Sequence, residues 1–157
     1  MPNFLEQLVA EWYEFRHYFV RRNVKVGKRP NGGYNSELDI VAFNPETKHL
    51  VHLEPSMDAH TWDKREQRFY AKFAAGKEHI PSLFKGFGGD LPEIEHIAVL
   101  GFAGNTRQSI GGGRILLIGD LMAEIRSGLR GRTVSNNAVP EQYVILRSLQ
   151  FASNYWK

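Results

Sequence analysis

The sequence predicts an α/β domain in which a central mixed sheet is flanked by helices. Three observations predict it: an amphipathic helical pattern at the start, a hairpin of two apolar strands, and two later apolar runs that alternate with helical segments. The predicted order is helix, three strands, helix, two strands and two helices. With 157 residues, the chain has the usual size of one domain, so we expect residues 1–157 to form a single unit.

A helix is predicted from Phe4 to about Arg21. Apolar residues recur there at the spacing of one helical face: Leu5, Leu8, Trp12, Phe15 and Phe19. The following NVKVGKRPNGGYN predicts a short strand, because its valines are followed by a Pro-Asn-Gly-Gly turn.

The next two strands are predicted to form a hairpin. ELDIVAF (37–43) and HLVHLE (49–54) are apolar runs, and the NPETK segment between them is short and begins with Asn-Pro. We therefore expect adjacent antiparallel strands. Side chains alternate along a strand, so Glu37 shares a face with Asp39, and Glu54 shares one with Ser56.

The second half of the chain continues the alternation of helices and strands. A charged segment from about Thr61 to Gly76 predicts a helix with Trp62, Phe69 and Phe73 on one face. EHIAVLGFA and RILLIG predict two buried strands, because each is a compact apolar run bounded by glycine or charge. Short helices are expected over 120–129 and 140–154.

Each hairpin strand carries a carboxylate among its apolar residues, Asp39 in the first and Glu54 in the second. The short NPETK connection lets these acids lie side by side. Because a buried unpaired charge is strongly unfavourable, we expect a cation between them. Two carboxylates near the end of a sheet suit Mg²⁺ or Mn²⁺, with the Pro55 carbonyl as a further ligand.

Basic residues are unevenly distributed although the net charge is only +3. Residues 21–30 contain no acid, whereas residues 37–63 contain six acids and one lysine. We expect the first segment to bind backbone phosphates of DNA through Arg21, Arg22, Lys25, Lys28 and Arg29. A second basic group is Arg126, Arg130 and Arg132. The alternative for either group is an ordinary solvated surface.

Composition excludes several classes of site. The chain has no cysteine, so disulfides, thiolate zinc sites and cysteine nucleophiles are excluded. No apolar run approaches a membrane span, and the acidic N-terminal segment is unlike a signal peptide, so we expect a cytoplasmic protein without a membrane partner. The sequence leaves open whether the protein forms a homodimer.

Taken together, a helical glutamate, ELDIVAF, a hairpin and HLVHLEPS resemble the core of the PD-(D/E)xK nuclease superfamily, which has the restriction-endonuclease-like fold. The resemblance covers roughly residues 4–75. It implies a metal-dependent nuclease that hydrolyses phosphodiester bonds in DNA as an endo- or exodeoxyribonuclease. It also implies that Asp39 and Glu54 bind Mg²⁺ or Mn²⁺, and that Glu11, which borders the apolar helical face, is the helical glutamate.

One position departs from this pattern. The superfamily has a lysine two residues after the second acid, whereas this chain has Ser56, which cannot supply a cation. Some members carry the lysine on the next helix, so Lys64 is a candidate replacement. Gln67 and Tyr70 resemble the glutamine and tyrosine of RecB-like nucleases, but their spacing is one residue short and ordinary packing is favoured.

Two other functions stay open beside a nuclease. One is a catalytically decayed nuclease-fold domain with a nucleic-acid-binding or structural role, which the serine at position 56 suggests. The other is an unrelated α/β protein. A histidine metal site is disfavoured because His49 and His52 face opposite ways on one strand. A triad of Ser56, His60 and Asp58 lacks the usual nucleophile motif, and the glycines at 111–113 predict a turn rather than a phosphate-binding loop.

Overall fold

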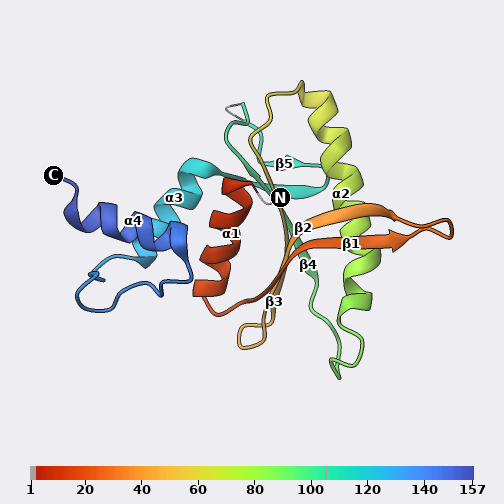
Figure 1. Cartoon of the computed structure of the whole chain (residues 1–157). Helices are drawn as coiled ribbons and strands as arrows, with labels where there is room; N and C mark the ends of the chain where they lie inside the picture. The colour runs from red at the N-terminus through yellow and green to blue at the C-terminus, as the bar shows by residue number, and fades with distance from the viewer. Residues whose placement is uncertain (1–2, 105) are drawn as a thin grey trace.

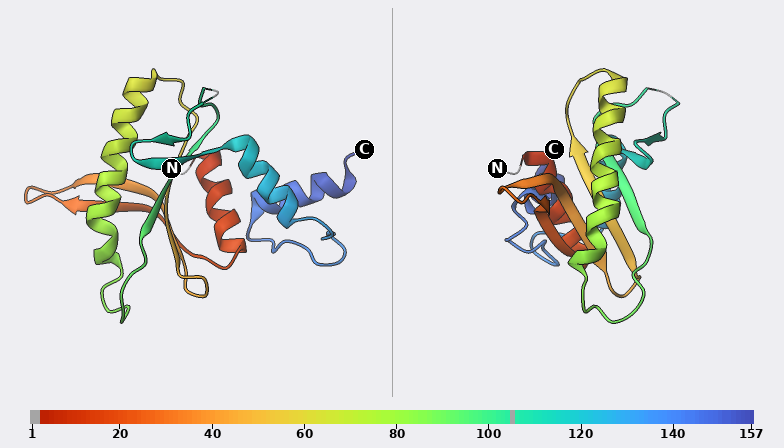
Figure 2. Two further views of the ribbon diagram at one scale, coloured as in Figure 1. Left: turned by 180° about the vertical axis from the view of Figure 1, so that it is seen from behind. Right: turned by 90° about the vertical axis from the view of Figure 1, so that its right-hand side faces the viewer.

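The computed structural model describes residues 3–104 and 106–157. A six-stranded mixed sheet lies at the centre of the α/β fold, with helices on both of its faces (Figures 1 and 2). The elements in chain order are α1 (Phe4–Phe15), β1 (Phe19–Lys28), β2 (Tyr34–Asn44), β3 (His49–Ser56), α2 (Trp62–Leu83), β4 (Ile94–Leu100), β5 (Ser109–Ile110), β6 (Gly113–Leu117), α3 (Ile118–Gly128) and α4 (Val144–Tyr155).

The strands lie in the order β1-β2-β3-β4-β6-β5. The first three form an antiparallel meander, β3, β4 and β6 run parallel, and β5 is a short antiparallel edge strand that the sequence did not predict. The predicted mixed sheet and the opening order of one helix and three strands are confirmed. The parallel strands require crossovers, which α2 and the segment after β4 provide.

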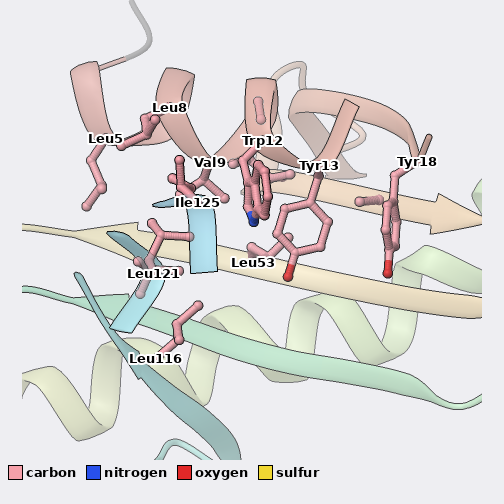
Figure 3. Close-up of a cluster of buried hydrophobic side chains, with 14 of the residues drawn as sticks. Leu5, Leu8, Val9, Trp12, Tyr13, Tyr18, Leu53, Leu116, Leu121 and Ile125 are labelled. Atoms are coloured by element: carbon pink, nitrogen blue, oxygen red, sulfur yellow. The ribbon is translucent and has the colours of Figure 1, made fainter. Parts of the chain in front are cut away.

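Helix α1 packs with α3 and α4 on one face of the sheet, and α2 covers the other face (Figure 2). Apolar side chains of α1 point toward Leu53 of β3, Leu116 of β6 and two residues of α3 (Figure 3). On the opposite face, Phe69 and Phe73 of α2 are buried against the parallel strands. None of the helices within residues 3–104 and 106–157 is both long and apolar enough to cross a membrane.

Helix α1 ends at Phe15, six residues before the predicted end. His17 takes a positive φ of 70°, and Tyr18 folds back so that its amide donates to the Tyr13 carbonyl. The chain then enters β1, where Phe19 is 74% exposed instead of lying on a buried helical face. Phe19 therefore matches the helical spacing of apolar residues only by coincidence, and it belongs to an edge strand.

Helix α2 continues to Leu83 instead of ending at Gly76. Gly76 lies inside the helix because the imidazole of His52 packs directly on its backbone. A methyl group at that position would overlap the ring, so the glycine permits a close approach between α2 and β3. Glycine is needed at this position because it has no side chain, and not for its conformational freedom.

The β1–β2 pair is irregular at Asn23, which has a φ of 52°. The register on either side places Asn23 opposite Asp39. Leu38 packs on the α2 side of the sheet, whereas Ile40 packs on the α1 side, although in a regular strand both would face one way. The strand is thus distorted at Asp39, the first predicted acid.

Candidate functional site

Asp39 and Glu54 lie where β2 and β3 separate. The last pair of the β2–β3 ladder is Ile40 with Leu53, so the two acids occupy the next opposed positions. Beyond this point β3 continues in register with β4, with Glu54 beside Ala98. The amide of Asp39 donates over 3.1 Å to Oε1 of Glu54. The expected juxtaposition of the two carboxyl groups therefore exists.

A cation lies between these acids, and it is the ammonium group of Lys72. Its Nζ is 3.3 Å from Oδ1 of Asp39 and 3.1 Å from Oε2 of Glu54. It also donates to the backbone carbonyl of Glu37. Lys72 comes from α2, which crosses this face of the sheet, and its side chain is about one quarter exposed, at 24%. The site is thus reachable from solvent at the lysine.

The Glu54 side chain is 1% exposed, and its two oxygens have different surroundings. Oε1 accepts from the Asp39 amide and lies 2.8 Å from Nε2 of His52. Oε2 is buried without a hydrogen-bond partner among the described residues and has only the Lys72 ammonium as a close charge. A buried oxygen without a hydrogen bond is unusual and is typical of a functional site or an ion site.

Burial raises the pKa of both carboxyl groups. The pKa of Asp39 is raised to about 7, mainly by burial and also by the neighbouring Glu54 carboxylate, while Lys72 opposes both effects. Burial also raises the pKa of Glu54, against the effect of Lys72. Burial alone lowers the pKa of Lys72, but the two carboxylates outweigh it and the net pKa is raised. The lysine is therefore a permanent cation near neutral pH.

These residues offer two carboxylates to a divalent ion, and Oε2 of Glu54 has no hydrogen bond among the described residues although the Lys72 ammonium lies beside it. In the part of the chain that the structure describes, no three His, Cys, Asp or Glu side chains form a metal cluster. The unpartnered Oε2 of Glu54 and the raised pKa of Asp39 fit an additional positive charge, because a cation would lower the energy of both ionised groups. The Pro55 carbonyl stays a predicted third ligand.

The lysine beside the two acids is Lys72, not Lys64. Lys64 is exposed near the start of α2, two turns from Lys72, and forms no ion pair with either acid among the described residues. Ser56 is buried, and its hydroxyl donates to Asp58 over 2.6 Å instead of reaching toward Glu54. Asp58 in turn pairs with the arginines of the first turns of α2. Ser56 therefore ends β3 and its side chain bonds locally to Asp58, away from the two acids.

Glu11 is also outside the site, contrary to the prediction. Its buried carboxylate accepts from the amides of Ile145 and Leu146 at 3.0 to 3.2 Å and caps the start of α4. A carboxylate is favourable at a helix N-terminus. The α1 acid that interacts electrostatically with Asp39 is Glu6. Burial raises the pKa of Glu6, and the Asp39 carboxylate raises it further.

The two basic groups lie at opposite ends of the molecule. The β1–β2 hairpin projects from the sheet and carries the first group, Arg21, Arg22, Lys25, Lys28 and Arg29, all of them exposed (Figure 1). The second group lies at the end of α3 and in the loop that follows it. There the Arg132 guanidinium stacks 4.9 Å from the Phe15 ring. Of the two basic groups, only the first lies on the hairpin whose second strand, β2, carries Asp39.

The sequence patterns did not assign Lys72 or Glu6 to this site. A signal for Lys72 exists, since it lies three residues after the buried Phe69 and four before the buried Gly76. That spacing puts it on the face of α2 that meets the sheet. Gln67 and Tyr70 are exposed, and Tyr70 is 67% exposed, so neither lies among these groups.

The structure also shows where the histidines and the glycine run of the disfavoured alternatives lie. His49 bonds to Tyr18 and Glu95, while His52 bonds to Glu54, so the two histidines do not share a site. Gly111 and Gly112 form the turn between β5 and β6, as predicted, and Gly113 begins β6.

The sequence matches no protein-family model, and no curated protein sequence is similar to it.

Proposed function

We propose that the protein is a metal-dependent nuclease of the PD-(D/E)xK kind, in which Lys72 replaces the lysine of the motif. The observation that carries this proposal is the position of the Lys72 ammonium, 3.3 Å from Asp39 and 3.1 Å from Glu54. Two acids and one lysine at a strand divergence provide the charges that phosphodiester hydrolysis needs. The serine at position 56 is then no obstacle to activity.

Asp39 and Glu54 would hold Mg²⁺ or Mn²⁺. When bound, such an ion supplies Lewis-acid stabilisation of phosphate charge and a more acidic water. The carboxylates fix its position, and the apolar neighbours of Glu54 limit access of bulk water. The nearby Glu6 adds negative charge at the edge of the site.

Lys72 would act as a cation and a hydrogen-bond donor. Its raised pKa keeps it protonated at neutral pH, so it does not serve as a general base. Its ammonium can orient a water for attack on phosphorus and bind a non-bridging phosphate oxygen. Hydrolysis then breaks one P–O ester bond and leaves a phosphomonoester and a hydroxyl group.

The exposed basic β1–β2 hairpin supports DNA as the substrate. Lys25 of β1 is paired in register with Glu37, two residues from Asp39. Cations so close to the acids would bind backbone phosphates and bring a phosphodiester to the site. The basic group at the end of α3 lies at the far end of the molecule and is not needed for this role.

One observation favours the second candidate, a nuclease-fold domain without activity. The Lys72 ammonium already lies within ion-pair distance of both acids and donates to the Glu37 carbonyl, so the acids have a cation beside them without a metal. Such a domain would still bind nucleic acid through the β1–β2 hairpin.

Manganese binding separates the two candidates. Calorimetry with Mn²⁺ should give one site in the wild type, and Asp39→Asn and Glu54→Gln should each weaken it at least about tenfold. Glu11→Gln should bind Mn²⁺ like the wild type, because that carboxylate caps α4. Unchanged affinity in both Asp39→Asn and Glu54→Gln, or no binding by the wild type, would overturn the proposed metal site.

A further inference from the structure

Glu54 is held by a histidine that no sequence motif assigns to the site. Nε2 of His52 lies 2.8 Å from Oε1 of Glu54, and the His52 side chain is fully buried. The residues are two apart on β3, so their side chains share the face that meets α2. The contact is therefore built into the strand and does not depend on a mobile loop.

The direction of this hydrogen bond follows from the neighbours of Glu54. The Asp39 amide can only donate to Oε1, and the Lys72 ammonium lies beside Oε2. Both contacts favour an ionised carboxylate, which only accepts hydrogen bonds. The hydrogen must therefore reside on Nε2 of His52.

A second histidine fixes the other side of the ring. Nδ1 of His52 lies 3.1 Å from Nδ1 of His96. A hydrogen bond between these two ring nitrogens needs one donor and one acceptor. Since the His52 hydrogen is on Nε2, its Nδ1 accepts and His96 donates from Nδ1. The chain runs in one direction, from His96 through His52 to Glu54.

Packing holds the His52 ring in this orientation. Phe73 contacts it edge to face with ring centroids 5.5 Å apart, and the backbone of Gly76 lies against its other atoms. A side chain at Gly76 would overlap Nδ1 and Cε1 of the ring and displace it. Two residues of α2 thus hold the imidazole in one position.

We propose that His52, oriented by His96, is a positioning residue that holds Oε1 of Glu54 and leaves Oε2 as the oxygen for the divalent ion. This inference rests on the proposed function, since it concerns the same metal site. Oε1 already accepts two hydrogen bonds, whereas Oε2 has none among the described residues. Groups that bond to a ligand fix its direction and raise metal affinity.

Nitrogen NMR of the metal-free protein tests the hydrogen-bond chain directly. Long-range ¹H–¹⁵N correlation spectra should show His52 with its hydrogen on Nε2 and His96 with its hydrogen on Nδ1, the less common form of a neutral histidine. The His52→Leu variant assigns the His52 signals. A hydrogen on Nδ1 of His52 would overturn the proposal, and this measurement needs neither metal nor activity.

Mn²⁺ calorimetry tests the effect on the site. His52→Leu should weaken Mn²⁺ binding by about 10- to 100-fold, whereas His52→Gln, whose amide can donate to Glu54, should stay within about threefold of the wild type. The exposed His60→Leu is the control and should bind normally. If His52→Leu binds Mn²⁺ like the wild type, the positioning role is wrong. If the wild type binds no Mn²⁺, the proposed function itself is wrong, and the NMR result stands separately.

Discussion

Nζ of Lys72 lies 3.1 Å from Oε2 of Glu54, a carboxylate oxygen that has no hydrogen bond among the described residues. This ion pair joins α2 to β3 at the point where β2 and β3 separate. We therefore expect Lys72 to contribute more to stability than an exposed lysine of the same helix.

Lys72→Met should destabilise the metal-free protein by about 2–4 kcal/mol at pH 8, because it leaves a buried carboxylate without its partner. The loss should be smaller at pH 5, where the carboxyl groups take up protons. Lys64→Met, from the exposed start of α2, should change stability by no more than about 0.5 kcal/mol. Urea denaturation measures both variants, and equal losses would contradict the assignment of Lys72.

Asp39→Asn should stabilise the metal-free protein at pH 8. The folded pKa of Asp39 is about 7, well above the value of an unfolded aspartate, so the carboxyl group favours folding below about pH 4 and loses this contribution as pH rises to 7. Asparagine resembles the protonated carboxyl group and keeps this contribution as the pH rises. We expect a gain on the order of 2 kcal/mol at pH 8 and almost none at pH 4, measured by denaturation. A variant less stable than the wild type at pH 8 would show that Asp39 is not crowded.

Gly76→Ala should destabilise the protein by about 1–3 kcal/mol, although alanine is the better helix former, because its methyl group overlaps the His52 ring. It should also weaken Mn²⁺ binding by moving His52 away from Glu54. Gly119→Ala in α3 is the matched control, since open space surrounds that position and the change should be neutral or stabilising. Similar thermal denaturation for the two variants would rule out the close packing at Gly76.

Neutralising the β1–β2 hairpin should weaken DNA binding in a salt-dependent way. The double change Lys25→Gln with Lys28→Gln should reduce the slope of log affinity against log salt by about 0.9 for each lost phosphate contact on duplex DNA. Arg126→Gln with Arg130→Gln, at the opposite end of the molecule, is the comparison and should keep the wild-type slope. Fluorescence anisotropy over a salt series measures both slopes. If the hairpin variant keeps its slope, that hairpin is ordinary solvated surface.

The strands and the pair of acids could be predicted because they depend on local patterns. Alternation along 37–43 and 49–54 and the short NPETK turn are sufficient to bring Asp39 opposite Glu54. The choice of Lys72 over Lys64 depends on how α2 rotates against the sheet, which is set by the close approach of Gly76 to His52. No local pattern contains that contact.

The choice of Glu11 failed for a similar reason. From its position beside the apolar face of α1, the Glu11 side chain could reach either the point where β2 and β3 separate or the start of α4. Its actual partner, the Ile145 amide, is 134 residues away in the sequence. Phe19 fits the helical period but lies in β1, because pairing with β2 outweighs a helical preference near the end of a segment. Long-range packing therefore decided both positions.

Cleavage of duplex DNA in the presence of Mg²⁺, compared between the wild type, Lys72→Met and Lys64→Met at equal folded concentration, tests the central claim most directly. We predict that the wild type cleaves, that Lys72→Met is at least about 100-fold slower, and that Lys64→Met cleaves at the wild-type rate. Absence of cleavage by the wild type, or equal rates for the wild type and Lys72→Met, would contradict a nuclease site built from Asp39, Glu54 and Lys72.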